Sequence, residues 1–333
     1  MYGPARERDK QDAESREMGT ASANQRTFTL APPVQPTTCQ GKASWLQAAI
    51  TYVTLTKPRV VGLVLFTAVA AVFAADRGAP SWSALVLLLV SGFLVAGGAA
   101  ALNHYFDRDI DSAMSRTRLR PLVTGQIRPP EIVLGAGSAM IGAGVLVAAA
   151  FNPIMAALLS TGAFIYVVVY TLWLKRRNPL NIVVGGLAGS CAVLSGWALV
   201  DPGLGVLPLL LAAVVFLWTP AHFWSLALVR VDDYRRAGVP MLPAVVGAQQ
   251  AARLVAVHVA GTVALSLGLQ RVASLGPLYL ALATGGGLVF LWMGARLIRH
   301  PAPAAAWPLF KFSGVYLGLL FFAVLLDRVL GGT

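Results

Sequence analysis

The chain has little charge for its length: 12% of its 333 residues are Asp, Glu, Lys or Arg, and 57% are hydrophobic. A soluble globular domain carries about 25% charged residues. This deficit argues against an ordinary water-soluble fold and favours a lipid bilayer as the solvent. Cysteine is also scarce, since Cys39 and Cys191 are the two in the chain and neither belongs to a metal or redox motif. We interpret both as structural or incidental residues.

The first 45 residues lack any apolar periodicity and are rich in Pro, Ser, Thr, Gln and mixed charges. Segments of this composition cannot bury enough apolar surface to fold, so residues 1–45 are predicted to form a disordered cytoplasmic tail. No apolar core follows their basic residues, which argues against a secretory signal. Five acidic residues argue against a mitochondrial transit peptide: Glu7, Asp9, Asp12, Glu14 and Glu17. The membrane domain is expected to occupy residues 46–333.

Long apolar runs alternate with short loops in the rest of the chain. A membrane-spanning helix needs about 20 residues, and in lipid each run must be helical because no water satisfies the backbone. Asn152 and Pro153 alone separate the third run from the fourth, where length and proline predict a turn. We therefore predict an all-α polytopic membrane protein with nine transmembrane helices. The nine runs are residues 59–76, 82–102, 131–151, 153–174, 180–200, 206–229, 251–269, 276–297 and 307–327.

A net charge of +12 can indicate nucleic-acid binding, but here the basic residues lie in short loops between apolar runs. Seventeen of the 26 Lys and Arg residues fall on one side of the predicted membrane, three on the opposite side and six in the tail. An excess of Lys and Arg marks the cytoplasmic side of a membrane protein. We expect no nucleic-acid partner, and a multi-pass protein of the cell (inner) membrane with a cytoplasmic N-terminus.

Carboxylates are rare after the tail, and five of the nine that remain fall in two segments on the predicted cytoplasmic side. The first segment continues the second span and contains Asn103, Asp107 and Asp111. Residues four apart share one face of a helix, so these side chains are expected to form one stripe. A cation between the two carboxylates would relieve their repulsion, and oxygen ligands of this type suit Mg²⁺. The alternative is a solvated acidic helix end. Asp109 faces away and is expected to pair with an arginine.

The next segment carries Arg116, Arg118 and Arg120 at alternate positions before Pro121. We interpret it as an extended strip of arginines that faces an anion, because a planar guanidinium binds two oxygens of a diphosphate. The alternative is the ordinary positive charge of a cytoplasmic loop.

The second carboxylate segment follows the sixth span and contains Asp232, Asp233 and Tyr234 among arginines. Two such segments indicate two Mg²⁺ ions that hold one diphosphate, because Mg²⁺ is usually bound by one or two carboxylates plus substrate phosphates. Asp107, Asp111 and Asp233 are therefore the predicted metal ligands. An active site built from these segments is expected to face the cytoplasm.

Two further segments supply candidate substrate-binding residues. Tyr170, Lys175 and Arg176 end the fourth span, where the two cations either contact phosphates or anchor the helix at the membrane interface. His222 lies among aromatic residues within the sixth span. An ionisable residue there is a functional candidate, and it either receives a planar ring or is hydrogen-bonded between helices. The glycines of residues 185–189 are interpreted as close helix packing.

Together these motifs resemble the UbiA-type intramembrane prenyltransferases, whose first signature is Asn-x-x-x-Asp-x-x-x-Asp. The resemblance is closer to those members that farnesylate protohaem IX, and the chain beyond residue 250 matches mainly in hydropathy. The segments that carry it are residues 55–59, 105–111, 116–121, 181–186, 222–224 and 232–243.

This resemblance implies nine helices around a central cavity that opens laterally to lipid. It implies farnesyl diphosphate and haem B as substrates, haem O and diphosphate as products, Mg²⁺ as the cofactor and haem A synthase as a partner. Asn103, Asp107 and Asp111 would serve the Mg²⁺–diphosphate. Lys175 and the arginines of residues 116–120 would bind phosphate oxygens.

The chain departs from the family pattern in its second carboxylate segment. Many relatives with other acceptors carry a second Asp-x-x-x-Asp, whereas here Arg230 and Tyr234 stand at the two ends. Asp232 or Asp233 is left to act in their place.

The reaction implied by the resemblance begins when Mg²⁺ and basic groups neutralise the leaving diphosphate. A haem vinyl group then attacks the farnesyl cation, and water completes the hydroxyethyl group. Two alternatives stay open: a prenyltransferase for an aromatic quinone precursor, and a nine-helix transporter that uses intramembrane carboxylates. The sequence has no convincing inverted repeat and its carboxylates lie at helix ends, which disfavours the transporter.

Overall fold

The computed structural model describes residues 45–76 and 80–330, and within these ranges the chain is helical with no β-strand. Nine helices in the described ranges are long and apolar enough to cross a membrane, which confirms the predicted number of spans. The predicted disordered tail covers residues 1–45, of which residues 1–44 lie outside the described residues and Trp45 begins a helix. The spanning helices are α3 (Pro58–Asp76), α4 (Trp82–Phe106), α6 (Glu131–Phe151), α7 (Pro153–Phe164), α8 (Asn181–Ala198), α9 (Val206–Val229), α12 (Ala248–Ala273), α13 (Pro277–Arg299) and α14 (Pro303–Leu330).

The fourth span changes its helical type along its length. The π-helix η2 (Ile165–Trp173) and the 3₁₀ turn η3 (Leu174–Arg176) extend α7, so that the span runs from Pro153 to Arg176. The sequence predicted one uninterrupted helix over residues 153–174. A π-helix has a wider turn than an α-helix and is frequent at functional sites.

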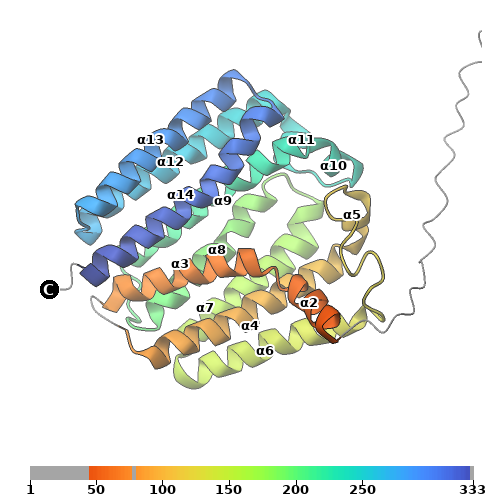
Figure 1. Cartoon of the computed structure of the whole chain (residues 1–333), viewed down its shortest axis with the longest axis horizontal. Coiled ribbons are helices and arrows are strands. Elements are labelled where there is room, and N and C mark those ends of the chain that lie inside the picture. The colour runs from red at the N-terminus through yellow and green to blue at the C-terminus, as the bar shows by residue number, and fades with distance from the viewer. Residues whose placement is uncertain (1–44, 77–79, 331–333) are drawn as a thin grey trace, which may run out of the picture. The chain divides into compact units, whose positions relative to one another are not determined.

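In the part of the chain that the structure describes, four short α-helices lie outside the spans. Figure 1 shows α5, α10 and α11 together at one end of the bundle, which we call the polar end, and α2 beside α3. These helices are α2 (Trp45–Leu55), α5 (Arg108–Ala113), α10 (Val231–Arg236) and α11 (Leu242–Val246).

The turn predicted between the third and fourth spans is confirmed and has a clear physical cause. Asn152 adopts an extended backbone, and its Oδ1 accepts a hydrogen bond of 2.8 Å from the backbone N–H of Met155. Pro153 occupies the first turn of α7, where its missing N–H costs no hydrogen bond. The Asn152 amide also donates to the carbonyl oxygen of Ala198 at 2.8 Å, which ties this turn to the end of α8.

Small residues allow the helices to approach closely. A Cβ atom added to Gly98 of α4 would lie 2.6 Å from the carbonyl oxygen of Gly137 in α6, and one added to Gly196 of α8 would lie 2.1 Å from that of Ala68 in α3. Backbones can meet in this way only where a side chain is absent. Gly185 and Gly186 pack against Tyr170 and Thr219, which confirms the packing predicted for residues 185–189.

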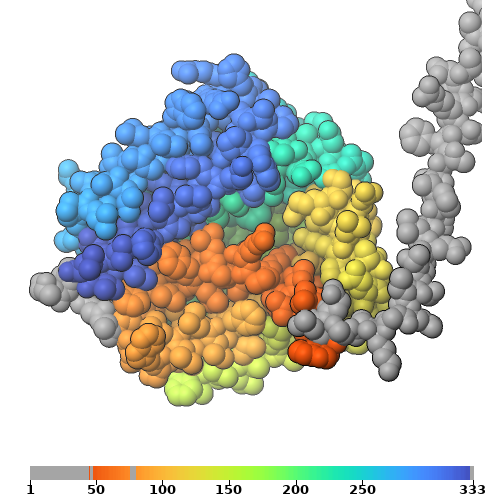
Figure 2. Space-filling model, viewed as in Figure 1, coloured from red at the N-terminus to blue at the C-terminus, as the bar shows by residue number. Residues whose placement is uncertain are grey.

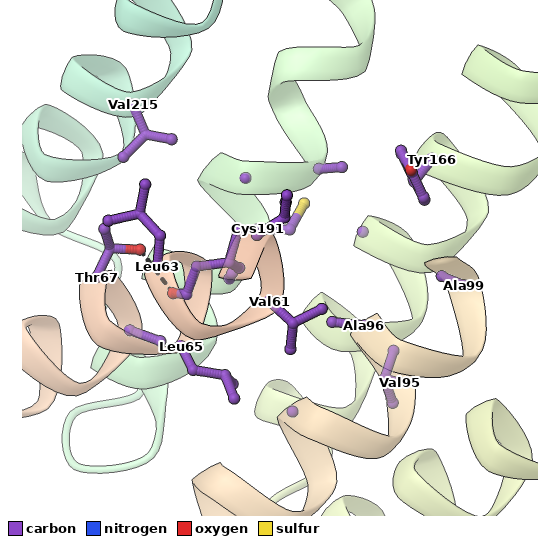
Figure 3. A pocket seen from close by; sticks show the side chains of 18 of the residues that line it. Val61, Leu63, Leu65, Thr67, Val95, Ala96, Ala99, Tyr166, Cys191 and Val215 are labelled. Carbon is purple, nitrogen blue, oxygen red and sulfur yellow. Dashed lines mark hydrogen bonds between the residues drawn. The ribbon is translucent and has the colours of Figure 1, made fainter. Parts of the chain in front are cut away.

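A cavity of about 340 Å³ lies within the bundle and is lined by α3, α4, α7, η2, α8 and α9, with one residue from α14. Figure 3 shows Val61 of α3, Val95 and Ala99 of α4 and Tyr166 of η2 around it. In Figure 2, α3 runs along the viewed face with α14 beside it. The cavity wall is almost entirely apolar, and Lys57 marks the polar end of its lining.

Candidate active site

The first carboxylate segment is buried at the polar end. Asn103, Asp107 and Asp111 are 3%, 0% and 3% exposed, so the alternative of a solvated acidic helix end is wrong. The expectation of one continuous helix is also wrong, because α4 ends at Phe106 and α5 begins at Arg108, with Asp107 as the joint. Backbone hydrogen bonds cross this joint from Asp107 N to Asn103 O (3.0 Å) and from Asp111 N to Asp107 O (2.7 Å). The side chains therefore keep their four-residue spacing despite the break.

Asn103 is the centre of a hydrogen-bond network that joins three distant segments. Its Oδ1 accepts from Lys57 Nζ at 2.6 Å, and its Nδ2 donates to Asp107 Oδ2 at 2.7 Å and to Thr171 Oγ1 at 3.0 Å. Asp107 Oδ2 also accepts from Lys175 Nζ at 2.5 Å. The predicted Lys175 is thus brought to the predicted Asp107, and both sit beside a lysine from the start of α3.

Lys57 is the main site residue that the sequence did not single out. It adopts a left-handed backbone (φ 51°) between α2 and α3, and its Nζ also donates to the Tyr166 hydroxyl at 3.1 Å. Burial, followed by the positive charges of Arg120 and Lys175, lowers the pKa of Lys57 to about 7. The sequence does contain a signal for Lys57, which stands directly before Pro58. Proline favours the first turn of a helix, so the span starts there and Lys57 lies at the same membrane face as Asn103.

The arginine segment approaches the first carboxylate segment through one residue. Arg120 forms an ion pair of 2.5 Å with Asp111, whereas Arg116 and Arg118 are exposed. The predicted extended strip is wrong: residues 114–121 form successive turns, held by bonds such as Arg118 N to Met114 O (3.0 Å). Alternate residues in turns do not share one face, so the three arginines do not line up. We call residues 115–120 the arginine loop.

Asp109 pairs with an arginine, as predicted. Its carboxylate accepts two hydrogen bonds from Arg176, at 2.6 and 2.7 Å, and Arg176 also donates to the carbonyl oxygen of Phe106 at 2.9 Å. The hydrogen bond from Arg176 is the largest cause that lowers the pKa of Asp109 to about 2. Arg176 therefore braces the joint between α4 and α5, and its predicted phosphate contact gains no support from this placement.

The second carboxylate segment lies at the same end, but its residues are differently engaged. Asp233 is buried and accepts from Ser115 Oγ at 2.7 Å, from Ser115 N at 3.3 Å and from Arg236. Burial favours the neutral acid, but the bonds from Ser115 and the charges of Arg236 and Arg230 outweigh it and lower the pKa of Asp233. The Asp232 side chain is 77% exposed and lies 3.5 Å from Arg235.

The described residues do not form a complete set of protein ligands for a metal ion, but they fit one divalent cation that is also bound by other oxygen ligands. In residues 45–76 and 80–330, no group of three His, Cys, Asp or Glu side chains is placed to hold a metal ion. Asp107 Oδ1, however, is buried and has no hydrogen-bond partner among these residues. A buried carboxylate oxygen without a partner is costly, and Mg²⁺ prefers oxygen ligands of this kind. Asp107 and Asp111 therefore fit Mg²⁺ as one part of a coordination sphere that phosphate oxygens and water would complete.

The remaining predicted substrate-binding residues are Tyr170, Tyr234 and His222, all of which have ring side chains. Tyr166 and Tyr170 stack at 5.8 Å on the π-helix, and Tyr234 is buried. His222 lines the cavity, lies 4.5 Å from the ring of Trp218 and is bonded to Ser313 Oγ of α14 at 2.7 Å. His222 is thus hydrogen-bonded between two helices, as one of the two interpretations predicted. It also borders the cavity, which is necessary for the other interpretation, in which it receives a planar ring.

Two missed residues, Tyr166 and Thr171, come from the π-helix. Tyr166 bonds to Lys57 and lines the cavity, and Thr171 is buried beside Asn103. Helical spacing from Tyr170 points to Tyr166. Nothing in the sequence indicates the wide turn that places Thr171.

Comparison with known proteins agrees with this architecture. Residues 64–324 match the model of the UbiA prenyltransferase family. A protoheme IX farnesyltransferase of Alkalilimnicola ehrlichii is 45% identical over 280 residues, which are 84% of this chain and 92% of that protein. One from Roseiflexus castenholzii is 41% identical over 90% of this chain, and the chain spans 56% of the length of that relative.

Solved structures show the same fold at low sequence identity. The structure of a digeranylgeranylglyceryl phosphate synthase aligns with a TM-score of 0.71 at 18% sequence identity. The alignment covers 84% of this chain and 98% of the synthase chain. A UbiA homologue from Archaeoglobus fulgidus, bound to GPP and Mg²⁺, has a TM-score of 0.64 at 19% identity, over 83% of this chain and 99% of its own. The nine-helix bundle, its buried carboxylate segment and the matched family model agree that this chain is a multi-pass membrane protein that belongs to the UbiA prenyltransferase family.

Proposed function

We propose that the chain transfers the farnesyl group of farnesyl diphosphate to a vinyl group of haem B, with haem O and diphosphate as products. One observation carries the proposal: Lys57 lines the apolar cavity and also bonds to Asn103, beside Asp107. A ligand with an anionic head and an apolar chain matches this junction. The farnesyl group and the haem acceptor come from the names of the relatives, which are protoheme IX farnesyltransferases.

In this proposal the diphosphate binds among the cations of the polar end. Lys57, Lys175 and Arg120 bring positive charge to the first carboxylate segment. Asp107 and Asp111 would hold Mg²⁺, which would supply Lewis-acid neutralisation of the diphosphate. The fixed positive groups stabilise the charge that develops on the leaving oxygen, and they act strongly because the site is buried.

The cavity protects the reacting carbon. When the allylic C–O bond breaks, its electron pair leaves with the diphosphate and a farnesyl cation remains. The vinyl group of the acceptor donates its π pair to form the new C–C bond. Water then adds to the carbocation beside the porphyrin ring and loses a proton. An apolar wall limits premature attack by water on the first cation. We assign the edge of the acceptor ring to the aromatic surface of His222 and Trp218.

The orientation of the protein follows from its charge. The loops at the polar end carry most of the basic residues of the chain, and by the positive-inside rule this end faces the cytoplasm. We propose the cell (inner) membrane as the location, with the active site open to cytoplasmic substrates. Haem A synthase remains a predicted partner, because it would consume the haem product.

The test is a reconstituted reaction with analysis of the haem by mass spectrometry. Purified protein receives haem B, farnesyl diphosphate and Mg²⁺, and parallel samples contain geranylgeranyl diphosphate or 4-hydroxybenzoate. We expect a haem in which one vinyl group has gained a farnesyl group and a hydroxyl group, and no such product from a matched Asp107→Ala sample. Prenylation of the aromatic acid with unchanged haem would replace this function by the quinone-precursor alternative.

A further inference from the structure

Asp233, the buried carboxylate of the second segment, is already hydrogen-bonded through both of its oxygens. Asp233 Oδ1 accepts from Ser115 N and Arg236, and Oδ2 accepts from Ser115 Oγ. A cation at this carboxylate would displace Ser115 and would lie close to Arg236. Asp232 points to solvent with 77% of its side chain exposed and has Arg235 as its neighbour, so it offers no enclosed site.

The position that begins this segment carries a positive charge. Arg230 follows α9 directly, and its Nε is buried without a hydrogen-bond partner among the described residues. The positive charges of Arg236 and Arg230 both act on Asp233. Two guanidinium groups around one carboxylate oppose a divalent cation and favour an anion. Asp107 differs, because its Oδ1 is buried and free.

The geometry points to a site for one divalent cation, held on the Asp107 side, in which Asp233 is a positioning residue that fastens the arginine loop through Ser115. This inference rests on the proposed function for the diphosphate ligand. The bonds between Ser115 and Asp233 join residues 118 positions apart. They fix the start of the loop whose later residue, Arg120, pairs with Asp111. Positive charge from arginines then takes the place of a second metal ion against the diphosphate.

The number of bound cations is measured with Mn²⁺ and electron paramagnetic resonance. Wild-type protein is titrated with Mn²⁺ in the presence of an unreactive thio-analogue of farnesyl diphosphate. We expect one Mn²⁺ per chain and no spin coupling between two ions. Asp107→Asn should lose this ion, and Asp233→Asn should keep it with an affinity within about twofold of wild type. Two coupled Mn²⁺ ions, one of which is lost in Asp233→Asn, would overturn the inference.

The fastening role is tested without reference to metal or turnover. Trypsin cleaves after Arg116 and Arg118, which are exposed in the arginine loop. Asp233→Asn and Ser115→Ala should each expose these bonds and accelerate cleavage several-fold. The double variant should cleave about as fast as Asp233→Asn alone, because the Ser115 Oγ bond is one of the contacts of Asp233. Asp232→Asn is the matched control, since Asp232 is exposed, and should cleave like wild type. Cleavage of Ser115→Ala at the wild-type rate would contradict the inference.

Kinetics complete the test. Loss of hydrogen bonds to a charged group should raise the KM for farnesyl diphosphate by about tenfold in both Asp233→Asn and Ser115→Ala, with a smaller change in kcat. If Asp233→Asn fails to fold, as judged by gel filtration, Ser115→Ala decides alone, because it removes the Oγ bond to Asp233 and leaves the charges of Asp233 and Arg236 in place. The Mn²⁺ count and the cleavage rates do not depend on which acceptor is prenylated. They therefore stand or fail separately from the assignment of haem B.

Discussion

The two carboxylate segments look alike in sequence and differ in the structure. In the first, Asp107 is fully buried, bonds to Lys175 and keeps one oxygen that has no hydrogen-bond partner in the described part of the chain. In the second, Asp233 is buried with both oxygens hydrogen-bonded, and Asp232 is exposed. The first segment continues a spanning helix beside the cavity, whereas the second begins a short helix behind an arginine loop. A buried carboxylate oxygen that no protein group contacts is the better candidate for a cation, whereas a carboxylate held by protein donors through both oxygens can fasten one segment to another.

The largest effect is expected at the first segment. Asp107→Asn preserves the size of the side chain but removes the free charged oxygen, and loss of such an electrostatic group costs about 10²–10³ in kcat. The initial rate of haem product formation measures it. Asp109→Asn is the matched control, because Asp109 is 65% exposed and pairs outward with Arg176, and it should retain most of the wild-type rate. Equal losses in the two variants would mean that damage to the helix joint, and not the free oxygen, causes the effect.

A second large effect is expected from the lysine at the cavity. Lys57→Met keeps the length of the side chain and removes the donor to Asn103 and Tyr166, so kcat/KM for farnesyl diphosphate should fall by about 10²-fold. Arg177→Met, which removes an exposed cation at the same end, should change it little. A full rate in Lys57→Met would show that the first carboxylate segment works without Lys57.

Smaller effects should separate the arginines of the loop. Arg120→Gln breaks the ion pair with Asp111, and loss of a charged hydrogen bond is worth about 1.5–3 kcal/mol, so KM for farnesyl diphosphate should rise by about tenfold or more. Arg118→Gln removes an exposed residue and should have no measurable effect on KM. A similar rise in both variants would support the original idea of a shared arginine strip.

The smallest effect is expected at Asp232. Exposed ion pairs contribute about 0–1 kcal/mol, and the pair with Arg235 is long and solvated. Asp232→Asn should therefore change kcat/KM by less than about twofold. A loss comparable to that of Asp107→Asn would remove the distinction between the two segments.

Much of this molecule follows from local physical rules. Nine spans could be predicted because each helix in lipid must satisfy its own backbone, and the Asn152-Pro153 turn follows from capping. The common face of Asn103, Asp107 and Asp111 was expected from their spacing, whereas a solvated helix end remained an alternative to their burial. The pairing of Asp109 with an arginine was expected because it lies off that stripe.

Long-range features could not be predicted in this way. Nothing near Ser115 in the sequence indicates its bond to Asp233, because that contact depends on how α5 and α10 meet. The π-helix that places Thr171 beside Asn103 has no local signature either. The extended arginine strip was wrong for a related reason: charge pattern alone does not determine whether a loop is extended or folded into turns.

The central claim is that Asp107 couples a divalent cation to the diphosphate. The direct test is the affinity for labelled farnesyl diphosphate, measured by equilibrium dialysis in the absence of haem, with and without Mg²⁺. If the two ligands are coupled, each raises the affinity for the other by the same factor, which is commonly about 5–150-fold. We predict that Mg²⁺ tightens binding at least about fivefold in wild type and in Asp233→Asn, and that this gain disappears in Asp107→Asn. A folded Asp107→Asn protein that keeps the full Mg²⁺-dependent gain would contradict the account.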